Sequence, residues 1–99
     1  MSELINQVYE KNPDFVYRQI AGESLLIPIR KKLNQVNNLY VLNETAAAIW
    51  NRIDGRRSME GVLGDITQEF EVSSEQLRQD TAVLIQDLLS IEAVKTTVS

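Results

Sequence analysis

The sequence predicts an α+β domain, and two observations lead to this prediction. Three short segments rich in β-branched and aromatic residues come first, at 15–20, 25–29 and 39–42. Three segments follow that combine helical spacing of apolar residues with capping residues at their starts. A small N-terminal antiparallel β-sheet of three strands followed by three α-helices fits a winged helix-turn-helix-like topology.

The expected strands are separated by turn and loop sequences. The first strand, "FVYRQI", ends at a glycine-containing turn over 21–24, and the second strand is "LLIPI". Pro28 has no amide hydrogen, so its position in the second strand favours an edge or an outward-facing backbone nitrogen. A polar connector over 30–38 then leads to the third strand, "LYVL".

The expected helices, at 44–53, 59–70 and 74–90, each follow a residue that can cap a helix. These capping residues are Asn43, Ser58 and Ser73, with Ser74 as the alternative to Ser73. Gly55 can adopt a positive φ and therefore ends the first helix. Trp50 lies between apolar neighbours in this helix, so we expect it in the core.

A chain of 99 residues corresponds to one domain. Residues 1–14 are polar and contain a proline, so we expect a flexible N-terminal arm or a short frayed helix there. The folded domain would span 15–94, with a C-terminal tail over 95–99. The apolar and β-branched residues within 91–98 could also form a short returning strand.

Composition excludes several kinds of chemistry. Cysteine and histidine are both absent, which removes disulfides, thiolate sites and the commonest general base. Asp80 and Asp87 lie two helical turns apart, about 10.5 Å along the axis, which is too far to share a proton. We therefore expect no enzymatic activity, no cofactor and no metal.

Charge and hydropathy also bear on possible partners. Residues 1–57 carry eight Lys/Arg and six Asp/Glu, a net of +2, whereas residues 58–99 carry two and eight, a net of −6. Because the most helical half is acidic, we expect no nucleic-acid binding. No apolar run reaches the length of a membrane span and no signal peptide is visible, so we expect a cytoplasmic protein without membrane contact.

One cluster of positive charge stands out in the polar connector. Arg30, Lys31 and Lys32 follow one another directly. Such a cluster most often serves solubility, and docking of an acidic partner is the alternative reading.

The third helix carries an apolar residue outside its core-facing stripe. Leu77, Thr81, Leu84 and Ile85 are among the residues that fall in the stripe. Val83 falls outside it, on a flank that also carries Asp80 and Asp87. A single exposed valine needs no special explanation. The alternative is an apolar floor with acidic rims that receives a ligand beside the helix.

The third strand offers a complementary feature. Leu39 and Val41 face one side of it, and Tyr40 and Leu42 face the other. If this strand is an edge, its free amides and carbonyls next to an apolar helix flank form a slot for an extended peptide.

The second half of the chain resembles the PqqD-like family, named for the pyrroloquinoline quinone (PQQ) synthesis protein D. The resemblance rests on "LN-x-TAA-x-I" at 42–49, "DG" at 54–55, "R-S-x-x-x-[VIL]" from Arg57 and "D-x-x-x-L" from Asp80. The ending "SIEAV" differs from the "GW" ending common in the PQQ proteins, which favours a member that serves another peptide pathway.

The resemblance implies a recognition element for ribosomally made precursor peptides, and therefore a function in PQQ biosynthesis or a related pathway. Such domains bind a precursor's leader segment as an added strand and present the peptide to a modifying enzyme, often a radical SAM protein. The residues expected to contact the leader are Leu39, Tyr40, Val41, Leu42, Asp80, Thr81, Val83, Leu84 and Asp87.

Two other functions fit the same fold. A winged-helix DNA-binding regulator would place the third helix in the major groove of DNA, but the acidic residues of that helix would be repelled by the phosphates. A small scaffold could bind a folded protein through the same groove.

Overall fold

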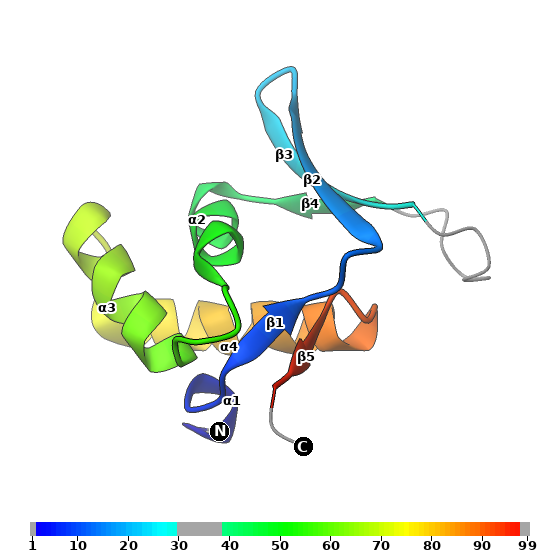
Figure 1. The fold of residues 1–99 in the computed structure, drawn as a ribbon. Coiled ribbons are helices and arrows are strands. Elements are labelled where there is room, and N and C mark those ends of the chain that lie inside the picture. The colour runs from blue at the N-terminus through cyan, green and yellow to red at the C-terminus, as the bar shows by residue number, and fades with distance from the viewer. Residues whose placement is uncertain (1, 30–38, 98–99) are drawn as a thin grey trace.

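A computed structural model describes residues 2–29 and 39–97 of the chain. In chain order the elements are α1 (Ser2–Ile5), β1 (Tyr9–Lys11), β2 (Phe15–Ile20), β3 (Glu23–Pro28), β4 (Tyr40–Leu42), α2 (Glu44–Arg52), α3 (Met59–Glu69), α4 (Ser74–Ser90) and β5 (Val94–Thr96). The architecture is α+β, as the sequence predicts, with the three main helices after the three main strands (Figure 1).

The three predicted strands form one antiparallel sheet in the order β2-β3-β4. Strands β2 and β3 are joined by a tight turn in which Ala21 and Gly22 both have positive φ, at 54° and 84°. Two successive positive φ values match the twist of a two-residue hairpin. The resulting hairpin rises beyond the helices, whereas β4 runs across the top of α2 and α4 (Figure 1).

All three predicted capping residues cap their helices. The Asn43 side chain accepts a hydrogen bond from the amide of Ala46 at 2.8 Å. Ser58 caps α3 through the amide of Gly61 at 3.2 Å, and Ser73 caps α4 through an amide at 3.1 Å. Each cap satisfies one of the free amides at a helix start, which is why these boundaries follow the sequence closely.

The core lies between the inner face of the β2-β3-β4 sheet and the helices. Trp50 of α2 is 2% exposed, which confirms its predicted core position. Leu26 on β3 and Ile85 and Leu88 on α4 are fully buried in the same cluster. None of the helices in 2–29 and 39–97 combines the length and apolar character needed to cross a bilayer.

The first fourteen residues differ from the expected flexible arm. Strand β1 pairs antiparallel with β5, so that Tyr9 lies opposite Thr96. Ile5 and Tyr9 are only 3% and 1% exposed and belong to the core. The returning strand is present as β5, and it crosses the expected domain boundary after Val94. This second sheet brings the N-terminal and C-terminal strands together next to α4 (Figure 1).

Candidate functional site

A groove of about 350 Å³ lies between β4 and α4. Strand β4 contributes Tyr40 and Val41, α4 contributes Asp80, Val83 and Leu84, and Ile49 of α2 lies at the groove floor. The strand and helix that the sequence predicts as a peptide slot are therefore neighbours in the fold. Asn43, Thr45 and Ala46, at the start of α2, complete the lining.

Strand β4 is an edge of its sheet. It pairs with β3 through Ser24↔Leu42, Leu25↔Val41 and Leu26↔Tyr40. Its other side pairs with no strand of the described residues. An open edge presents unpaired amide and carbonyl groups that can bond an additional strand. In this protein those groups border the groove.

The helix side of the groove is apolar. Val83 is 59% exposed, as its position outside the core stripe predicts. Leu84 and Ile49 also line the groove, but they are 7% and 2% exposed and belong to the core. Val83 is therefore the apolar group that a ligand could cover without disturbing the core.

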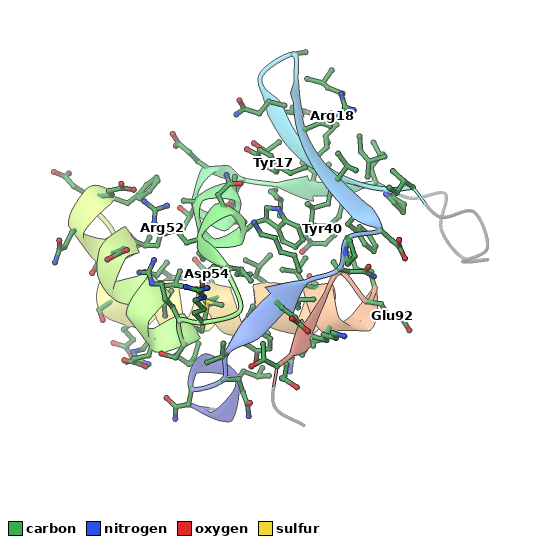
Figure 2. The ribbon with its side chains drawn as sticks, in the orientation of Figure 1. Tyr17, Arg18, Tyr40, Arg52, Asp54 and Glu92 are labelled. Atoms are coloured by element: carbon green, nitrogen blue, oxygen red, sulfur yellow. The ribbon has the colours of Figure 1, made fainter. Side chains whose placement is uncertain are left out.

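A hydrogen bond joins the two walls of the groove. The hydroxyl of Tyr40 on β4 donates to a carboxylate oxygen of Asp87 on α4 at 2.9 Å. Burial raises the pKa of Tyr40 to about 12, with further contributions from the hydrogen bond and the negative charge of Asp87. Figure 2 shows Tyr40 in the space between β4 and α4. The bond links the edge strand to the helix beside the groove.

Acidic groups mark the rim. Asp80 lines the groove, and its carboxylate accepts a hydrogen bond from the side-chain amide of Gln76 at 2.9 Å. Neither lysine nor arginine is among the described residues that line the groove. The site therefore carries negative charge at its edge and apolar surface inside. Within 2–29 and 39–97, no group of carboxylates is arranged to hold a metal ion.

Four of the predicted site residues do not line the groove: Leu39, Leu42, Thr81 and Asp87. Asp87 is exposed on α4 and reaches the groove residue Tyr40 through their hydrogen bond. Thr81 is 0% exposed, so it lies under the surface of α4 and cannot contact a ligand in the groove. The sequence pattern already put it in the core stripe, and packing against the core buries its methyl group. Leu42 is 3% exposed and faces the core as well. Leu39 is half-exposed next to β4 but does not line the groove.

The basic cluster Arg30, Lys31 and Lys32 lies outside the described residues. Helix α2 also contributes to the groove, through its first turn and Ile49, and the predicted site did not include it. A signal for it exists, because Asn43 caps α2 directly after β4 and so forces the start of the helix next to the strand.

Comparison with known proteins identifies the family. The sequence profile described as Coenzyme PQQ synthesis protein D (PqqD) matches residues 23–94. Comparison with curated proteins finds no match.

Among solved structures, the fold is similar to that of "TbiB1 in Complex with the TbiA(beta) Leader Peptide", with a TM-score of 0.68. The similarity covers 87% of this chain and 94% of TbiB1 at 17% sequence identity, a level at which it shows a shared fold. The family match spans β3, β4, α2, α3 and α4, and so includes the three elements that line the groove, β4, α2 and α4. On this evidence the chain belongs to the PqqD family.

Proposed function

We propose that this protein binds the leader segment of a ribosomally made precursor peptide as an added strand along β4. The observation that carries the proposal is the open edge of β4 beside a groove whose helix wall exposes Val83. Membership of the PqqD family supports it, as does the similar fold of TbiB1, which is described in complex with a leader peptide.

Two interactions would share the binding energy. The backbone of the leader would bond to the free edge of β4, an interaction that tolerates many side chains. Alternate leader side chains would pack on Val83 and on the exposed part of Leu84, and would gain affinity by burying apolar area. Asp80 and Asp87 would stand at the rim and select against acidic leader residues.

The protein would act as a carrier without catalysing a reaction. The leader would stay in the groove while the rest of the precursor reaches a modifying enzyme of the radical SAM class, and both would meet in the cytoplasm. In this picture the β2–β3 hairpin is the wing of a winged helix-turn-helix fold, and α3 and α4 are the helix-turn-helix pair.

The proposal is tested by titrating labelled protein with synthetic leader segments, taken from short reading frames encoded beside this gene. Val83→Lys places an ammonium group where the leader would cover it, and desolvation of that charge should weaken binding by on the order of tenfold or more. Because the Val83 side chain is mostly exposed, this variant should unfold at nearly the wild-type temperature.

The matched control is Gln68→Lys, which adds the same charge at an exposed position of α3 outside the groove. It should bind the leader like the wild type. Equal binding by the folded Val83→Lys protein would show that the leader does not occupy this groove. Transfer to the modifying enzyme is tested separately, by comparing modification of the precursor with and without this protein.

A further inference from the structure

The sheet that provides the binding edge has an apolar outer face, turned away from the helices. Directly paired residues share one face of a sheet, so Arg18, Leu25 and Val41 lie together on this face. Leu25 is 7% exposed yet lies outside the buried cluster that forms the core. Figure 2 shows Tyr17 and Arg18 on opposite sides of the hairpin, as alternation along β2 requires.

The exposed part of this face is concentrated beside the open edge. Val41 in the middle of β4 is 59% exposed, and Leu39 just before the strand is 50% exposed. Alternation along the strand puts both side chains on the side opposite Tyr40. Val41, as part of the edge strand, also borders the groove. On the other side of the same edge, Val83 is also 59% exposed. The edge of β4 is therefore bordered by uncovered apolar side chains on both sides.

A strand added to this edge would meet both sides. Its residues opposite Tyr40 and Leu42 would point into the groove, and its residue opposite Val41 would point to the outer face. Cross-strand neighbours approach to about 5 Å, close enough for direct side-chain contact. The outward residue of the leader would therefore cover Val41, and the residue two positions away would cover Leu39.

From this geometry we infer that the bound leader segment is apolar on both faces, as an unbroken run of β-branched or aromatic residues. This inference rests on the proposed function and specifies the class of peptide. A strand with one face in water would alternate apolar and polar residues. Here the negative charges of Asp80 in the groove lining and of Asp87, which bonds the groove residue Tyr40, add a second requirement, that no aspartate or glutamate occupies the groove-facing positions.

The test is selection of short random peptides displayed on phage, with wild-type protein as bait and removal of peptides that also bind the Val83→Lys protein. We expect the remaining peptides to share a run of consecutive apolar residues without acidic groups. Val41→Thr keeps the β-branched shape of the side chain but replaces a methyl group by a hydroxyl. It should weaken binding of a selected peptide by about two- to fivefold.

Ile20→Thr is the matched control, because Ile20 is 52% exposed at the hairpin tip and lies far along the chain from the β4 edge. It should leave peptide binding unchanged. Selected peptides that alternate apolar and polar residues, and that bind Val41→Thr like the wild type, would overturn the inference while leaving the groove in place. If no selected peptide depends on Val83, the proposed function fails and the inference falls with it.

Discussion

The hydroxyl of Tyr40 and the carboxylate of Asp87 lie 2.9 Å apart, although 47 positions separate them in the chain. Their hydrogen bond connects the edge strand β4 to α4 beside the groove. Tyr40 is one of three tyrosines, and burial together with Asp87 raises its pKa to about 12. Ionisation of Tyr40 would remove the proton that this contact needs.

The first prediction follows from this shift. Because the pKa of Tyr40 is higher in the folded protein than its usual 10.0, the folded state favours the protonated phenol. The resulting stabilisation is complete below pH 10 and is lost as the pH rises from 10 to about 12. We expect the difference in unfolding free energy between wild type and Tyr40→Phe to shrink over this interval.

Denaturant unfolding at a series of pH values measures this difference, and tyrosinate absorbance follows the ionisation directly. Asp87→Asn should lower the pKa of Tyr40 from about 12 but leave it above 10.0, because burial is the larger cause. Identical alkaline profiles for wild type and Tyr40→Phe would mean that the contact contributes nothing in solution.

Local signals in the sequence account for most of this fold. Capping residues at Asn43, Ser58 and Ser73 specify where the main helices begin, and four-residue spacing specifies their buried faces. The same periodicity on α4 identified Val83 as exposed. These features are local, since each depends on residues within one or two turns of a helix.

The β1–β5 sheet could not be predicted in the same way. Each strand has three residues, too few for alternation to be visible, and the partners lie at opposite ends of the chain. The burial of Tyr9 depends on that pairing and on no local pattern. Likewise, Thr81 falls in both the core stripe and the expected binding surface, and packing against neighbouring elements decides between them.

The second prediction concerns the N-terminal segment. Tyr9 is 1% exposed, and its hydroxyl donates to the Leu4 carbonyl oxygen at 2.8 Å. Tyr9→Ala should therefore lower the free energy of unfolding by about 3–5 kcal/mol, as for other buried aromatic residues. Tyr9→Phe should cost about 1 kcal/mol, because it removes only the hydrogen bond.

Thermal and denaturant unfolding of these variants provide the measurement. Asn6→Ala, at an exposed position of the same segment, is the control and should be nearly neutral. Wild-type stability of Tyr9→Ala would restore the interpretation of residues 1–14 as a flexible arm.

The third prediction concerns Thr81, which is 0% exposed and whose hydroxyl has no hydrogen-bond partner within 2–29 and 39–97. A buried hydroxyl without a partner costs about 1–3 kcal/mol relative to water. Thr81→Val removes that hydroxyl and keeps the shape of the side chain, so it should raise the free energy of unfolding by about 1 kcal/mol.

Thr81→Ser provides the opposite comparison, because it keeps the hydroxyl and removes the buried methyl group. It should be less stable than the wild type. Leader binding by Thr81→Val should be unchanged, since the side chain does not reach the groove. A destabilised Thr81→Val protein would indicate that the hydroxyl is hydrogen-bonded in solution.

The last prediction separates peptide binding from DNA binding. In the DNA alternative α4 would enter the major groove, yet this helix exposes Glu75, Asp80 and Asp87. Its arginine, Arg78, is paired with Glu60 of α3. The neighbouring Arg57 is likewise paired with a carboxylate, at 2.5 Å. These two arginines are therefore held in ion pairs and would have to leave their carboxylate partners to bind phosphate.

We therefore expect no sequence-specific complex with duplex DNA at physiological salt. The measurement is a gel shift with labelled fragments from the region upstream of this gene, in the presence of competitor DNA. Glu60→Gln, which frees Arg78 from its ion pair, serves as a sensitised variant and should also fail to shift them. A specific complex at sub-micromolar protein that weakens steeply with added salt would support a regulator, because release of counterions from phosphate produces that dependence.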